Sequence, residues 1–225
     1  TKNQNKFIFT IFEKRTKRSD LPFFHKAMSE FNHKGIACPT PITVNENNIF
    51  NIKEKPCAIY SFIEGNQIQS LNNDAMGSLA KNISTIHHIG AQSELYRENN
   101  MLLPSWKYII NKFNDYDGEN ISEFTYIKNL ISSLESQFPQ NLKKSLIHGD
   151  LFKDNIFFKN NEVSGFIDFF FTCSDTIVYD LATLVNAWFL HYENFNENYF
   201  KIFFDQYCDS ISWTNEEKES FNFYL

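Results

Sequence analysis

The chain has 225 residues, enough to bury a sizeable core without disulfides or metal ions, and its 42% hydrophobic and 21% charged residues are ordinary for a globular protein. Its 21 basic and 27 acidic residues give a net charge of −6. Because no long basic run is present, the composition argues against nucleic acid or a membrane as the main partner.

The cysteine pattern and the hydropathy indicate a compartment. The cysteines are far apart and form no CxxC pair, which is typical of free thiols in a reducing cytosol; they are Cys38, Cys57, Cys173 and Cys208. No apolar run approaches the roughly 18 residues of a membrane span, and the first residues lack the apolar segment of a signal peptide. We therefore expect a cytoplasmic protein.

The first 63 residues are predicted to form a small, strand-rich lobe. Residues 6–12 (KFIFTIF) are aromatic and β-branched, as in strands. A helix is predicted over about residues 20–34, with a proline in its first turn and a glycine after its end. Residues 49–52 follow a polar segment typical of a hairpin turn, and the apolar run 57–63 predicts a buried strand.

Helices are predicted to dominate from residue 64 onward, in a second lobe that extends to residue 225. Apolar residues at helical spacing, together with capping residues, predict helices that begin near residues 73, 104, 121, 179, 196 and 214. Residues 155–158 and 163–169 interrupt them as a predicted β-hairpin. The sequence therefore predicts an α+β protein with two lobes and a hinge near residues 64–65.

One stretch carries the pattern of a phosphoryl-transfer site. Residues 146–158 (LIHGDLFKDNIFF) contain H-x-D-x-x-x-x-N, the spacing of a kinase catalytic loop. Asp150 is expected to accept the proton of the attacking hydroxyl, and Asn155 to bind a magnesium ion. After the predicted hairpin, Asp168 stands where kinases hold the metal that bridges the nucleotide phosphates. The simpler alternative, a turn followed by a surface carboxylate, does not explain this order of features.

Two further residues are expected to support the loop rather than to react. Asp180 is predicted to cap the helix that follows it, and bracing the catalytic-loop backbone is a second role compatible with capping. His148 is expected to orient the loop without an acid–base role. His87 and His88 are adjacent rather than four residues apart, so packing explains them better than a metal pair does.

These features resemble those of the aminoglycoside-phosphotransferase-like kinases, which share the protein-kinase architecture. Within that group the chain is most similar to the homoserine kinases of this fold. The matching segments are 21–24 (LPFF), 148–155 (HGDLFKDN), 164–171 (SGFIDFFF), 179–182 (YDLA) and 185–188 (VNAW). The resemblance runs from about residue 6 to residue 188 and is weak between 92 and 144. The whole group shares the catalytic triplet, so only the flanking residues point to homoserine.

The resemblance implies a reaction, two cofactors and two binding segments. ATP and Mg²⁺ would act on L-homoserine to give O-phospho-L-homoserine, a step toward threonine. Hinge hydrogen bonds to adenine would come from the backbone of Ser61, Phe62 and Ile63. The carboxylate and amine of homoserine need a cation and an anion in the helical lobe, where the candidate residues are Asp175, Asn186 and Trp188.

The chain departs from the wider group in its phosphate-binding residues. The strand lysine of that group is matched by Thr10, and its helix glutamate by Phe23 or Phe24, which leaves Lys14 and Arg15 as candidate substitutes. No glycine-rich motif occurs among the seven glycines, so the phosphate-covering loop is expected upstream of residue 1. Both ends of the sequence look interrupted, and we expect a fragment that lacks both termini.

Two alternatives remain open. One is a kinase of the same fold that acts on another hydroxyl compound, such as an aminoglycoside, choline or a thio-sugar. Acidic or aromatic residues near the C-terminal helices favour such a site, namely Glu193, Glu197 and Tyr199. The other is a non-catalytic nucleotide-binding protein, which the missing lysine–glutamate pair suggests. The presence of all three base and metal residues argues against it.

Overall fold

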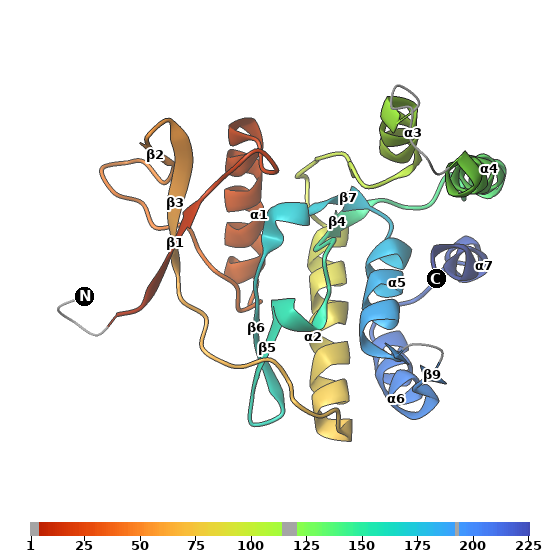
Figure 1. Ribbon diagram of the computed structural model, residues 1–225. Coiled ribbons are helices and arrows are strands. Elements are labelled where there is room, and N and C mark those ends of the chain that lie inside the picture. Colours follow the sequence, from red (N-terminus) through yellow and green to blue (C-terminus); the bar gives the residue numbers. More distant parts are fainter. Residues whose placement is uncertain (1–4, 114–120, 192–193) are drawn as a thin grey trace.

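The computed structural model describes residues 5–113, 121–191 and 194–225, and Figure 1 shows their arrangement. A small sheet with one helix lies on one side of the molecule, and a larger, mainly helical part lies on the other. The predicted α+β class is confirmed.

The smaller part holds a three-stranded antiparallel sheet. Its strands are β1 (Phe7–Ile11), β2 (Phe50–Ile52) and β3 (Lys55–Ser61), in the order β1-β3-β2. The tight turn between β2 and β3 lies at Lys53 and Glu54, both with positive φ. The turn predicted before β2 instead closes a separate bridge between Val44 and Asn47. The segment therefore has two turns, at residues 45–46 and 53–54, where the sequence predicted only the first.

Helix α1 (Leu21–His33) packs its apolar face toward this sheet and toward the larger part. The helix has Pro22 in its first turn and ends before Gly35, as predicted. Its buried apolar residues recur at spacings of three and four, the period of a one-sided helix; they are Leu21, Phe24, Ala27, Met28 and Phe31. Burying them stabilises the folded chain by roughly 1.5–3 kcal/mol for each large side chain.

The larger part is built around α2 (Asn73–Ala91), which contacts α6 (Glu197–Cys208), β4 (Ser145–Ile147) and β6 (Glu162–Phe166) (Figure 1). The Asn72 side chain caps α2 by accepting a hydrogen bond from the Ala75 N–H. The other helices are α3 (Leu103–Phe113), α4 (Ile121–Gln137), α5 (Ile177–Trp188), α6 (Glu197–Cys208) and α7 (Asn215–Tyr224). In α7 the predicted capping box between Thr214 and Glu217 is confirmed. None of the helices within the described residues has the length and hydropathy that a bilayer crossing requires.

Short strand pairs position the loops of the larger part. The predicted hairpin is confirmed as β5 (Ile156–Lys159) and β6 (Glu162–Phe166). A pair that the sequence did not indicate joins β4 (Ser145–Ile147) to β7 (Cys173–Asp175). A third pair joins β8 (Leu190–His191) to β9 (Asn194–Phe195). Short 3-10 turns are η1 (Arg18–Asp20), η2 (Lys153–Asn155) and η3 (Phe169–Phe171).

An aromatic cluster connects the two parts. Phe170, in η3 of the larger part, places its ring 5.0 Å from Phe12, 5.6 Å from Phe24 and 6.1 Å from Tyr60, measured between ring centroids. The rings meet edge to face, the geometry that aromatic quadrupoles favour. One continuous hydrophobic core therefore runs from the sheet through α1 and into α2.

Candidate active site

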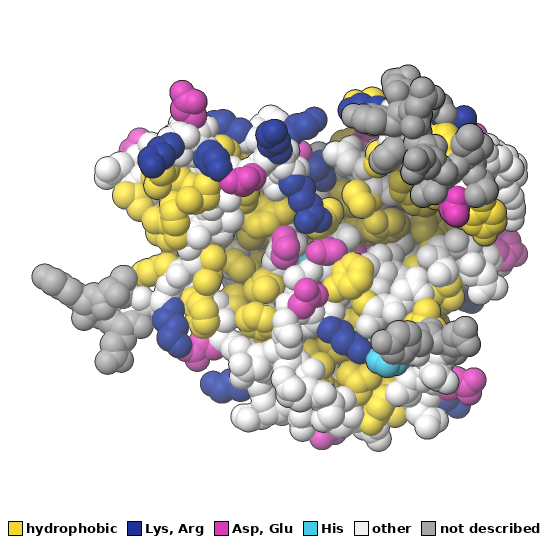
Figure 2. Space-filling view, viewed as in Figure 1, with side chains coloured by type: hydrophobic (Ala, Val, Ile, Leu, Met, Phe, Trp, Pro, Cys, Tyr) yellow, Lys and Arg dark blue, Asp and Glu magenta, His cyan; other side chains and the backbone are white. Residues whose placement is uncertain are grey.

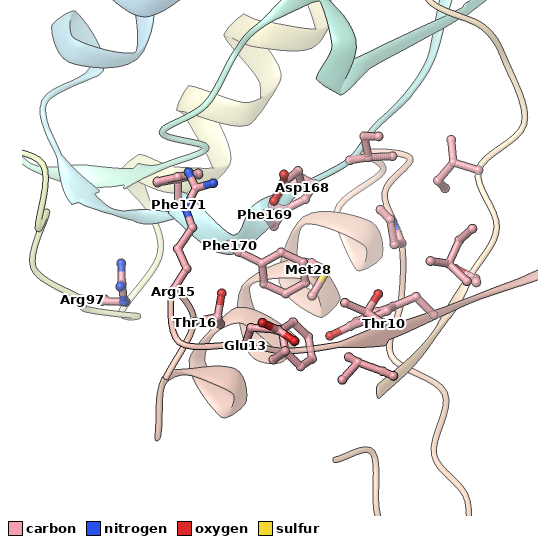
Figure 3. Close-up of a pocket in the computed structure, with 18 of the residues that line it drawn as sticks. Thr10, Glu13, Arg15, Thr16, Met28, Arg97, Asp168, Phe169, Phe170 and Phe171 are labelled. Atoms are coloured by element: carbon pink, nitrogen blue, oxygen red, sulfur yellow. The ribbon is translucent and has the colours of Figure 1, made fainter. Parts of the chain in front are cut away.

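A cavity of about 700 Å³ lies between the sheet of the smaller part and the segment 167–171. Figure 2 shows acidic side chains in the centre of a hollowed face, with basic side chains along the upper border. Most of the lining is apolar, which suits a flat aromatic ligand. The charged residues of the lining are Glu13, Arg15, Arg97 and Asp168 (Figure 3).

The catalytic-loop sequence leaves β4 and turns sharply at Gly149. Gly149 has φ of +82°, and a Cβ built on it would lie 2.6 Å from the carbonyl oxygen of Phe171. Any side chain here would therefore be strained twice, by the backbone conformation and by the close neighbour. The loop returns through η2, where the Asn155 N–H donates to the Phe152 carbonyl, and passes into β5.

Asp180 braces the loop backbone from α5. Its Oδ2 accepts a hydrogen bond from the His148 N–H (3.1 Å) and its Oδ1 accepts one from the Gly149 N–H (2.8 Å). The buried His87 also forms a hydrogen bond from Nε2 to Oδ2 (3.1 Å), and its Nδ1 is hydrogen-bonded to the Tyr207 hydroxyl (2.7 Å). The prediction that Asp180 caps a helix is wrong, because α5 begins earlier and Thr176 is its N-cap.

His148 is buried and holds the loop to the end of β6. The Ile167 carbonyl can only accept, so Nε2 carries the proton of this bond (3.0 Å), and Nδ1 accepts from the Asp150 N–H (3.2 Å). Both bonds require the neutral ring. Burial lowers the pKa of His148, against the opposing effects of the nearby carboxylates, and so favours the same form.

Asp150 and Asn155 contact each other directly. Asn155 Nδ2 donates to Oδ2 of Asp150 (2.8 Å) and to its backbone carbonyl (2.9 Å), which orients the carboxylate and leaves Asn155 Oδ1 available. Burial raises the pKa of Asp150 above its usual value, and the hydrogen bond from Asn155 partly offsets that effect. A raised pKa makes the carboxylate a stronger base.

Asp168 lies at the mouth of the cavity with left-handed backbone angles (φ 61°, ψ 56°). Its side chain is exposed, and its charge acts on Asp150 by raising the pKa of that residue. The oxygens of Asp168 and Asn155 are the hard donors that Mg²⁺ takes, and Mg²⁺ completes its shell with waters and phosphates rather than with many side chains. No cluster of three His, Cys, Asp or Glu residues suited to a metal occurs within the described residues. The donor set fits a magnesium ion that is shared with a nucleotide.

The predicted hinge residues line the cavity. Ser61, Phe62 and Ile63 lie at and just beyond the end of β3. The Ser61 N–H donates to the carbonyl of Thr40 (3.0 Å), so this N–H is already paired within the protein. Thr10 also lines the cavity, and none of the described lining residues is a lysine.

The structure does not bring the three predicted substrate residues together. Asp175 precedes α5, whereas Asn186 and Trp188 lie at its far end, about 15 Å along the helix axis. Asn186 is exposed and donates to the carbonyl of Leu225. Trp188 is 2% exposed, and its indole N–H donates to the carbonyl of Leu151 (3.0 Å). None of the three lines the cavity, so their role in substrate binding stays a prediction.

A loop that the sequence did not single out forms one wall of the cavity. Arg97 and Asn99, between α2 and α3, are both part of the lining. Asn99 Nδ2 donates a hydrogen bond to Oδ2 of the buried Asp175 (2.7 Å), so Asp175 positions a lining residue without lining the cavity itself. Nothing in the local pattern of this loop distinguishes it from an ordinary connection. Glu193, a candidate of the alternative substrate site, lies outside the described residues.

Comparisons with known proteins agree with this geometry. The chain is 36% identical over 187 residues to the homoserine kinase of Bartonella tribocorum, an alignment that covers 82% of this chain and 59% of the relative. It is 32% identical over 184 residues to the homoserine kinase of Mesorhizobium japonicum, which covers 81% of this chain and 58% of the relative. The chain therefore spans less than two thirds of the length of these curated relatives.

Solved structures with the same fold include kinases of small molecules. The amicoumacin kinase hAmiN, in complex with AMP-PNP, Ca²⁺ and Ami, gives a TM-score of 0.80 at 15% identity over 98% of this chain and 71% of that one. The choline kinase LicA from Streptococcus pneumoniae gives 0.70 at 16% identity over 98% and 73%. At such identities the likeness shows the fold, which is protein-kinase-like as predicted.

The sequence profile of the phosphotransferase enzyme family matches residues 1–219, almost the whole chain. The fold, the catalytic-loop spacing and this match agree, and the chain belongs to the phosphotransferase enzyme family.

Proposed function

We propose that the chain is the greater part of a homoserine kinase, which transfers the γ-phosphoryl group of ATP to the hydroxyl of L-homoserine. The observation that carries the substrate assignment is the identity of 32–36% to several curated homoserine kinases. The contact between Asp150 and Asn155 beside the cavity supports the reaction type.

In this reaction Asp150 is the general base. Its carboxylate accepts the proton of the homoserine hydroxyl while that oxygen forms a bond to the γ-phosphorus. The bond between the γ-phosphorus and the bridging oxygen breaks, and ADP leaves with the electron pair. Asn155 holds Asp150 in position, so the base needs little reorganisation when the hydroxyl approaches.

Asn155 and Asp168 would hold Mg²⁺, which supplies charge neutralisation to the phosphates when bound. Residues 1–63 would form the nucleotide-binding lobe, with Ser61, Phe62 and Ile63 next to adenine. Residues 64–225 would carry the base, the metal ligands and the acceptor site. The cavity between the two parts supports this division, because its lining comes from both.

The test is phosphorylation by the purified protein with Mg²⁺ and ATP, using L-homoserine, L-serine, choline and kanamycin as acceptors. L-Homoserine should give the highest kcat/KM. L-Serine lacks one methylene, which is typically worth about 10- to 200-fold in a fitted pocket, and its shorter chain also draws the hydroxyl away from Asp150. Equal or better turnover of choline or kanamycin would reject homoserine as the substrate. No turnover with any acceptor would favour the non-catalytic alternative.

A further inference from the structure

The cavity has two cations in its lining, and they differ in their surroundings. Arg97 is committed to the protein: it donates to Asp20 Oδ2 (3.1 Å) and to the Thr172 carbonyl (3.3 Å). It also lies over the ring of Phe24, 4.8 Å from its centroid. A guanidinium held by these partners has few donors left for a ligand.

Arg15 lies in the loop after β1 and extends toward Phe171, as Figure 3 shows. Its guanidinium carbon is 4.4 Å from the centroid of the Phe171 ring. Within the part of the chain that the structure describes, Arg15 has no carboxylate partner at salt-bridge distance. Stacking on an aromatic ring restricts a guanidinium while leaving its N–H groups directed outward.

Arg15 lies in the same cavity as one of the predicted metal ligands. Arg15 and Asp168 both line this cavity, and the Phe171 ring on which Arg15 stacks is three residues after Asp168. The loop of Arg15 belongs to the small sheet, whereas Asp150 and Asp168 belong to the larger part. The Arg15 side chain therefore extends from the smaller part to a ring of the larger part, in the segment that carries Asp168.

The charge balance of the site calls for such a cation. Asp150, Asp168 and a triphosphate would place several negative charges in one cavity, and Thr10 offers no positive charge from the strand. A planar guanidinium can donate two parallel hydrogen bonds to a phosphate, and donors fixed before the reaction are the most effective at stabilising the charge of phosphoryl transfer.

We propose that Arg15 binds the outer phosphates of ATP and takes the role that a strand lysine fills in other kinases of this fold. This inference rests on the proposed function only in taking a nucleoside triphosphate as the ligand. It does not depend on which hydroxyl compound accepts the phosphoryl group.

The experiment measures equilibrium binding of AMP-PNP with Mg²⁺, and of adenosine, by calorimetry without any acceptor. Arg15→Met should weaken AMP-PNP binding at least tenfold, the usual range for loss of a charge-assisted bond, and should change adenosine binding less than twofold. Arg15→Lys should recover part of the loss. Lys14, the other candidate that the sequence offered for phosphate binding, carries the same charge one residue away but does not line the cavity. Lys14→Met is therefore the matched control and should change neither affinity more than twofold.

The adenosine measurement also reports whether the cavity is intact. Equal losses for AMP-PNP and adenosine would mean that Arg15 only supports the fold, and equal losses for Arg15→Met and Lys14→Met would mean a diffuse charge effect. Either result overturns the proposal, as does unchanged AMP-PNP binding in Arg15→Met or no AMP-PNP binding by the wild type. If AMP-PNP binding depends on Arg15 but homoserine is not phosphorylated, only the proposed acceptor is wrong.

Discussion

Asp180→Asn tests the brace beneath the catalytic loop. The buried carboxylate of Asp180 accepts from the backbone N–H groups of His148 and Gly149 and from His87. An asparagine has nearly the same shape, but only one of its two terminal atoms is an acceptor. Its amide group would face one of these donors, so at least one buried N–H would lose its partner.

The expected cost follows from these contacts. A hydrogen bond to a charged group contributes about 1.5–3 kcal/mol, and a buried donor without a partner costs about 1–3 kcal/mol. Asparagine is neutral, so the mutant avoids the desolvation penalty of a buried carboxylate, and this gain offsets part of the loss. We expect the free energy of unfolding to fall by about 3 kcal/mol, or about 6–12 °C in Tm for a chain of this size.

Urea unfolding at neutral pH measures the loss of unfolding free energy. Phosphorylation kinetics report whether the catalytic loop has shifted. A shift of the loop by about 1 Å is expected to lower kcat by about 10²-fold, with little change in binding of AMP-PNP. The matched control is Asp209→Asn, an exposed aspartate at the end of α6, which should change stability by no more than about 0.5 kcal/mol. An Asp180→Asn protein within about 1 kcal/mol of the wild type would refute the reasoning.

Three other changes test separate parts of the structure. Asp150→Asn should lower kcat about 10²- to 10⁴-fold in the phosphorylation assay with AMP-PNP affinity almost unchanged; more than a tenth of the wild-type rate would exclude Asp150 as the base. Gly90→Ala would place a Cβ 1.9 Å from the Leu146 carbonyl oxygen and should lower the free energy of unfolding in urea by about 3 kcal/mol or more. In the control Gly77→Ala, the new Cβ meets only the flexible end of the Gln206 side chain, so the free energy of unfolding should stay the same or rise. Because burial lowers the pKa of His148, the stability that this residue contributes is complete above the unfolded pKa near 6.5 and is lost as the pH falls below that value. The difference in unfolding free energy between wild type and His148→Gln should therefore narrow by up to about 1.4 kcal/mol per pH unit from 6.5 downward. A difference that stays constant with pH would contradict a neutral buried ring.

The residues that could be predicted are those whose geometry is local. Asp150 and Asn155 are five residues apart in one tight loop, so their spacing alone implies that they meet. The helices and the β5–β6 hairpin also depend on residue spacing within one segment, so their order along the chain could be predicted. The capping box of α7 is a third case, because all its hydrogen bonds lie within four residues.

The remainder depends on contacts between distant segments. His87 meets Asp180 across 93 positions and Tyr207 across 120, and no pattern within either segment reveals the pairing. Strands β4 and β7 have three residues each, too few to show a period. Trp188 was predicted to line a substrate site, but an aromatic residue on an apolar helix face is equally typical of a core.

The ring of Phe170 has a consequence for how ligands enter and leave. Phe170 follows Asp168 by two residues and is packed among rings of the sheet and of α1, so the carboxylate at the cavity mouth is coupled mechanically to the smaller part. Wide separation of the two parts would expose this ring to water, at a cost of roughly 1.5–3 kcal/mol. Under the proposed function, the two parts should therefore stay in contact at this ring while a nucleotide enters or leaves.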